Sequence, residues 1–73
     1  MQKKLSELNF GESGTISEIC SSEHELNRLG VRLNKQLRMI TKQPIKGPVV
    51  VVIDEMEVAL GLGAAAHVIV RLE

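Results

Sequence analysis

The chain has 73 residues, 44% of them hydrophobic, and its nine basic and nine acidic residues give a formal net charge of zero. This length limits it to a single domain over residues 1–73 with a small core, since a domain of about 60 residues buries only about 60% of its unfolded surface. Neutral charge gives no reason to expect nucleic acid or an anionic membrane as the ligand, and the single cysteine, Cys20, excludes an internal disulfide.

The N-terminal residues show no signal-peptide pattern, and the longest apolar run, residues 49–53, is too short to span a bilayer. We therefore expect a protein of the reducing cytoplasm. In chain order, Gly11 and Gly14 indicate a turn. Residues 15–20 then alternate as in a strand, and the break in alternation at Glu18 and Ile19 predicts a bulge or a strong twist.

A short helix is expected next. Ser22 and Glu25 have the spacing of a capping box. Leu26 and Leu29 lie three residues apart on one helical face, and Gly30 is suited to end the helix in the left-handed conformation. The pattern predicts a helix of about two turns.

The second half of the chain alternates between strands and turns. Residues 36–42 alternate between two faces and predict a strand with a basic outer face, and the prolines of 44–48 favour a loop. Further strands are expected at 49–53, 56–60 and 68–72, with a polar turn at 54–55 and a helical turn at 62–66. Four or five short strands predict a mainly β, partly closed small barrel with one or two short helices, because closure hides strand edges.

The glycines and apolar residues follow an order that covers nearly the whole chain. The segments are Leu5-Ser6-x-Leu8-x-x-Gly11-x-x-Gly14-x-Ile16, Leu26-x-x-Leu29-Gly30-Val31, Pro44 and Pro48 around a glycine, Val58-Ala59-Leu60, and Ala65-x-x-Val68-x-Val70. In this the chain resembles ferrous iron transport protein A, the FeoA family. The resemblance implies a cytosolic SH3-like barrel that assists a ferrous-iron permease with a cytosolic GTP-binding domain. It also implies kinship with the same barrel in iron- and manganese-dependent repressors.

The chain departs from the family pattern in three places. A glycine usual after the helix is Asn34 here, and asparagine tolerates the left-handed region better than most residues. The glycine common before the penultimate strand is Glu55, which predicts a shifted turn. The charged stretch that usually follows 58–60 is replaced by Gly-Leu-Gly-Ala at 61–64, which removes charge from an expected surface.

Residues 61–66 also match the Gly-x-Gly-x-x-Ala pattern of dinucleotide-binding turns. Only seven residues follow, without the required helix, strand and distant acid, so we favour a tight turn with small-residue packing. A further hypothesis is that Gly61 and Gly63 allow close approach of a partner backbone, as small residues do between helices.

Metal-binding and catalytic patterns are poorly developed. No Cys-x-x-Cys or His-x-x-x-His spacing is present, so we expect no metal site and no cofactor. Cys20 and His24 are the candidates for a weak contact with Fe(II) or another transition metal. The sequence has two histidines and no recognisable motif that would pair either with a nucleophile, so we do not expect an enzyme.

Six basic residues and no acid lie between positions 28 and 46: Arg28, Arg32, Lys35, Arg38, Lys42 and Lys46. They form either a solvated face balanced by nearby glutamates or a docking surface for an acidic partner or the anionic inner leaflet. Direct binding of nucleic acid is not expected, because strand binding depends on aromatic stacking and the chain has one aromatic residue. The residues predicted at a partner interface are Leu29, Gly30, Arg38, Lys42, Gly61 and Gly63.

The sequence thus predicts a non-catalytic accessory protein of bacterial ferrous iron uptake. Its expected partner is the cytosolic GTP-binding region of the permease, which would recruit it to the inner face of the membrane. Two alternatives remain open: a stand-alone relative of the repressor barrel that acts in regulation through another chain, and a small RNA-binding barrel. Self-association also remains open, because 49–53 would pair readily if it were an uncovered edge strand.

Overall fold

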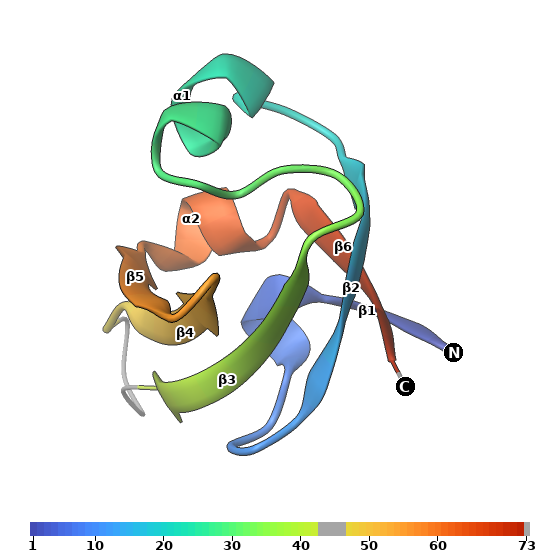
Figure 1. Ribbon diagram of the computed structural model, residues 1–73, viewed down its shortest axis with the longest axis vertical. Coiled ribbons are helices and arrows are strands. Elements are labelled where there is room, and N and C mark those ends of the chain that lie inside the picture. The colour runs from blue at the N-terminus through green and yellow to red at the C-terminus, as the bar shows by residue number, and fades with distance from the viewer. Residues whose placement is uncertain (43–46, 73) are drawn as a thin grey trace.

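The computed structural model describes residues 1–42 and 47–72, and the side chains of all of these except 41 and 42 (Figure 1). Its elements are β1 (Gln2–Lys4), the 3-10 helix η1 (Leu5–Glu7), β2 (Ser13–Ile19), α1 (Glu23–Arg28), β3 (Gln36–Lys42), β4 (Val49–Ile53), β5 (Met56–Leu60), α2 (Leu62–Ala65) and β6 (Val68–Leu72). The predicted loop at 44–48 lies mostly outside the described residues.

All six strands belong to one antiparallel sheet in the order β1-β6-β2-β3-β4-β5. The sheet bends around the core without closing into a barrel, and α1 lies at one end of the molecule, between β2 and β3 in the chain (Figure 1). The mainly β, partly open architecture with two short helices is therefore confirmed. In the described part of the chain no helix has the length and apolar character needed to cross a bilayer.

One aliphatic cluster forms the core, and every strand from β2 to β6 contributes to it. In β4, for example, Val49, Val51 and Ile53 are buried, while the valines between them are half-buried on the other face. The remaining members are Leu5, Leu8, Ile16, Leu26, Val31, Leu37, Met39, Val58, Leu60, Ala65, Val68 and Val70. No polar side chain is buried in the part of the molecule that the structure describes. The core therefore depends on aliphatic packing alone.

Two irregularities bend the sheet. The pairing of β2 with β6 shifts between Ile16 and Glu18, which confirms the predicted bulge. A second shift, between Met39 and Thr41 in β3, was not predicted. An extra residue in one strand leaves the ladder locally unpaired and increases its twist. These bulges help to curve a narrow sheet around a small core.

The helix α1 forms as predicted, but its start differs. Ser22 adopts a left-handed conformation with φ 58° and makes no side-chain cap hydrogen bond, so the predicted capping box is wrong. A capping hydroxyl reaches the helical amides from extended backbone, which Ser22 does not adopt. At the other end, Gly30 has φ 97°, and its N–H and that of Val31 donate to the carbonyls of Asn27 and Leu26. This paired arrangement confirms the predicted glycine stop.

The β4–β5 hairpin keeps its register without the family's glycine. Asp54 and Glu55 have φ 52° and 67°, and Ile53 pairs directly with Met56. A two-residue turn with both φ values positive matches the twist of the strands, so Glu55 accepts a strained left-handed backbone in this turn. Asn34, with φ 70°, confirms that asparagine sustains the left-handed position after the helix.

Three expectations need correction. The N-terminal β1 and η1 were not predicted, and they raise the number of strands to six. The segment 49–53 is not an edge strand, because β4 pairs with β3 on one side and β5 on the other. The alternation in 56–60 puts Met56 on the same face as the buried Val58 and Leu60, yet Met56 is 68% exposed because it begins β5 at the hairpin turn.

Candidate functional site

The only aromatic side chain of the sequence lies at the surface. Phe10 is 78% exposed in the turn between η1 and β2. The next residue, Gly11, has φ 85°, and its N–H donates to the Met39 carbonyl at 3.0 Å. The Met39 N–H donates back to the Glu12 carbonyl at 2.9 Å. The turn is therefore tied to β3 by backbone hydrogen bonds at Gly11 and Glu12.

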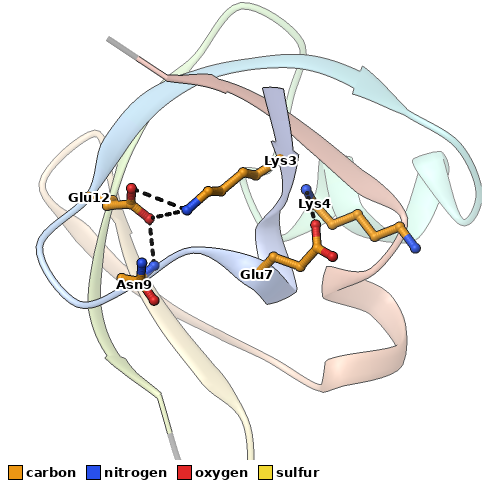
Figure 2. A network of polar contacts seen from close by, with 5 residues as sticks. All are labelled: Lys3, Lys4, Glu7, Asn9 and Glu12. Carbon is orange, nitrogen blue, oxygen red and sulfur yellow. Dashed lines mark hydrogen bonds and ion pairs between the residues drawn. The ribbon is translucent and has the colours of Figure 1, made fainter. Parts of the chain in front are cut away.

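A network of polar side-chain contacts, here called the clamp, also fixes this turn (Figure 2). The Glu12 carboxylate accepts the Asn9 N–H at 2.7 Å and lies 3.2 Å from the Lys3 ammonium. The Asn9 hydrogen bond, followed by Lys3, lowers the pKa of the Glu12 carboxyl below its ordinary value. In the preceding turn, the Glu7 carboxylate accepts the Lys4 N–H at 3.1 Å. The turn that carries Phe10 therefore has little conformational freedom.

The clamp predicts an acid-dependent loss of stability. Because folding lowers the pKa of Glu12 below 4.5, the carboxyl contributes stability that is fully present above that pH and is lost as the pH falls through the folded-state value. We expect Glu12→Gln to lower the thermal midpoint at pH 7 and to flatten the decline of that midpoint as the pH falls below about 4.5, the ordinary pKa of a Glu carboxyl. Thermal unfolding followed by circular dichroism across this range measures both. Glu57→Gln, at an exposed position of β5, is the matched control, and an unchanged profile for Glu12→Gln would contradict the role of the clamp.

Beside this turn lies a hollow of about 310 Å³, lined by Phe10, Gly11, Arg38, Met39 and Ile40. Met39 belongs to the core, Ile40 is half-buried, and Arg38 is exposed on β3. Of the residues predicted for partner binding, Arg38 is the one found here. Phe10 was missed, although an aromatic residue beside a turn glycine was a signal that could have indicated it.

A second, wider hollow lies at α1. It measures about 450 Å³ and is lined by Glu25, Arg28 and Leu29. Leu29, which caps the helix and is 52% exposed, offers an apolar contact there, next to the Gly30 turn. The predicted residues Leu29 and Arg38 therefore lie in different hollows. The side chain of Lys42 is outside the described residues.

The predicted Gly61 and Gly63 are both exposed, at the start and inside of α2. A methyl group added at either glycine would meet no atom within 4 Å, so the space above them is open. α2 has four residues and β6 follows at Val68, which confirms the helical turn and differs from the long helix of a dinucleotide-binding unit. Open space is compatible with close approach of a partner, but neither glycine is among the described residues that line the two hollows.

Comparison with known proteins identifies the family. The model of the FeoA domain matches residues 3–72. The chain belongs to the FeoA family. No curated protein sequence matches it significantly.

Solved structures share the fold of this FeoA protein. The crystal structure of an iron uptake regulatory protein, FeoA, is 26% identical, with a TM-score of 0.92 over 100% of this chain and 99% of the other. A manganese-dependent transcriptional repressor is 25% identical, with a TM-score of 0.90 over 99% of this chain, which spans only 42% of the repressor. FeoA from Stenotrophomonas maltophilia, complexed with zinc and described as an SH3 domain protein, is 24% identical, with a TM-score of 0.75 over 100% of this chain and 89% of the other. The predicted SH3-like fold is confirmed.

The FeoA chain shows little that would hold a metal. Cys20 and His24 are both exposed, and the Cys20 thiol lies 3.5 Å from the Glu18 carboxylate. Desolvation, followed by that carboxylate, raises the pKa of the Cys20 thiol, which disfavours the thiolate that binds metals. Within residues 1–42 and 47–72 no three His, Cys, Asp or Glu side chains lie together in a way that could hold an ion.

Proposed function

We propose that this FeoA protein is a non-catalytic accessory protein of bacterial ferrous iron uptake that binds the cytosolic GTP-binding region of the ferrous iron permease. The match of the FeoA domain over residues 3–72 carries the proposal. A fold shared over its whole length with an iron uptake regulatory protein supports it. The zinc-bound relative from Stenotrophomonas maltophilia has itself been suggested as an activating factor for ferrous iron transport.

The surface suits binding better than catalysis. Catalysis needs a nucleophile or base positioned by a neighbouring group, usually in a desolvated cleft. The described residues include no buried polar side chain, whereas Phe10 and Leu29 leave large apolar groups exposed beside cations. Apolar groups with arginine nearby are typical of protein interfaces. The protein would act in the cytoplasm and reach the inner face of the membrane through the permease.

A titration tests this proposal. The isotope-labelled chain is mixed with the cytosolic GTP-binding region of a ferrous iron permease from the same organism, and amide shifts are followed with and without guanine nucleotide and Fe(II). We expect saturable shifts with the permease region and none with an unrelated GTP-binding protein of similar size. Absence of shifts at high partner concentration would reject this contact.

A regulatory role is the second candidate, favoured by the 25% identity to the manganese-dependent repressor. Helix-turn-helix proteins read DNA with two packed helices, whereas the described residues hold two separate helices of six and four residues. Such a role would require a separate DNA-binding chain. Shifts caused by a metal-dependent repressor, in the absence of shifts caused by the permease, would select it. Binding of RNA with a steep salt dependence would instead select the small RNA-binding barrel.

A further inference from the structure

The Phe10 turn exposes a rigid apolar surface. Burial of a phenylalanine side chain is favourable, and the free protein forgoes most of this gain at Phe10, which is 78% exposed. The turn is held by the backbone bonds to Met39 and by the bonds of Asn9 and Lys3 to Glu12. A group fixed before binding loses little conformational entropy when a partner docks. The turn is therefore prepared for contact.

Met39, which forms the floor of the hollow, is held in place as firmly as the Phe10 turn. Met39 is 1% exposed and belongs to the core, so the floor cannot recede without disturbing it. The bulge in β3 lies between Met39 and Thr41, so it falls at Ile40, which lines the hollow. Bulges often re-aim side chains beside functional surfaces. Phe10 and Ile40 thus give the hollow apolar walls around a buried sulfur-containing side chain.

The positive charge of Arg38 at this hollow has no ion-pair partner among the residues that the structure describes. Across the sheet, Arg38 pairs with Ser13 on β2 and Val52 on β4, both uncharged. Glu12, which precedes Ser13, is already bound by Lys3. Arg38 forms no ion pair with any other described residue, since the pairs found there are Lys3–Glu12 and Lys35–Asp54. The charge of Arg38 is available to a carboxylate from outside.

We propose that the hollow between Phe10 and Arg38 docks a short segment of a partner protein that carries a large apolar side chain next to a carboxylate. The apolar side chain lies against Phe10 and Ile40 above Met39, and the carboxylate pairs with the Arg38 guanidinium. The volume of about 310 Å³ is at the small end for binding pockets and suits one side chain rather than a whole cofactor. Identifying the permease as the protein that supplies this segment rests on the proposed function. The apolar and positively charged character of the hollow does not depend on that identification.

Aromatic and arginine side chains are the residues over-represented among energetic hot spots, and arginine binds a carboxylate through two parallel hydrogen bonds. The first experiment titrates the isotope-labelled chain with a blocked peptide Gly-Asp-Leu-Phe-Glu-Gly and with its counterpart in which lysine replaces each acid. We expect the acidic peptide to shift the amides of Gly11, Met39 and Ile40. The lysine peptide should bind at least about tenfold more weakly, as expected for loss of a hot-spot ion pair.

Two variants and a control test the assignment. Phe10→Ala and Arg38→Glu should each weaken the acidic peptide by at least about tenfold, and Arg38→Glu should in addition improve binding of the lysine peptide. Met56→Ala removes a comparably exposed apolar side chain from β5 and should change nothing. All three positions are exposed, so we expect the variants to keep the thermal midpoint within a few degrees. Shifts elsewhere on the surface, or equal binding of the two peptides, would overturn the proposal.

The same variants are then titrated with the cytosolic region of the permease. If the wild type binds and Phe10→Ala and Arg38→Glu bind equally well, the docking proposal is wrong and the proposed function stands. If the wild type does not bind the permease, the proposed function fails, and the peptide result still decides the surface. Two results identify another occupant and overturn the proposal: phosphatidylglycerol vesicles bound only by the wild type, or a dimer in sedimentation equilibrium that Phe10→Ala dissociates.

Discussion

Gly14→Ala is expected to destabilise the domain by about 3 kcal/mol, at the upper end of the usual cost of overpacking. A Cβ atom at this position would lie 2.4 Å from the Arg71 carbonyl oxygen, 2.7 Å from Val70 Cγ1 and 3.0 Å from the Arg71 carbonyl carbon. Two of these atoms are backbone and cannot rotate away. The methyl group would therefore push β6 away from β2, where Gly14 pairs with Leu72.

Thermal unfolding followed by circular dichroism measures the effect. In a domain of this size each kcal/mol shifts the midpoint by roughly 4–8 °C, so Gly14→Ala should lower it by at least about 12 °C. Gly63→Ala is the matched control, because its methyl group meets nothing within 4 Å. In helix α2 that change should stabilise the domain by about 0.5–1 kcal/mol, since glycine is the poorer helix former. If Gly14→Ala and Gly63→Ala had similar thermal midpoints, β6 could move away from β2 without loss of stability, and the prediction would be wrong.

Local patterns in the sequence predicted the strands whose two faces differ. In β3 the alternation placed Leu37 and Met39 inside and Arg38 outside, as the structure has them. Side chains alternate across a strand by geometry alone, so this inference needs no knowledge of the partner strand. The same holds for positions that require a left-handed backbone, such as Gly30. These features could be predicted because each depends on a few neighbouring residues.

Features that depend on distant partners were missed. β1 has only three residues, too few for a periodic pattern, and it exists because Lys3 pairs with Val70 of β6. The capping box had the right spacing, yet Ser22 precedes the helix in a left-handed conformation and its hydroxyl makes no cap hydrogen bond. The exposure of Phe10 depends on the bonds that join its turn to Met39. The alternation in β3 therefore predicted that Arg38 lies at the surface, whereas Phe10, which lines the same hollow, was not predicted for the candidate site.

Leu8→Ala is expected to cost about 2–5 kcal/mol, the usual range for a leucine truncated in a core. Leu5 and Leu8 are both fully buried, and η1, which lies between β1 and the Phe10 turn, packs against β6 and α2. Domains are typically stable by about 0.05–0.15 kcal/mol per residue, so one such loss removes a large part of the total. Leu5→Ala should behave alike, whereas Met1→Ala, at an exposed position, should have little effect.

Urea unfolding gives the free-energy change, and amide hydrogen exchange at Gly11 shows where the loss acts. Leu8 immediately precedes the clamped turn, and the Gly11 N–H donates to Met39 across it. If Leu8 anchors the turn, Leu8→Ala should speed exchange at Gly11 more than its loss of global stability accounts for, because a local opening is added to global unfolding. Exchange at Gly11 that follows global stability alone would instead mean that the clamp and the bonds to Met39 hold the Phe10 turn by themselves.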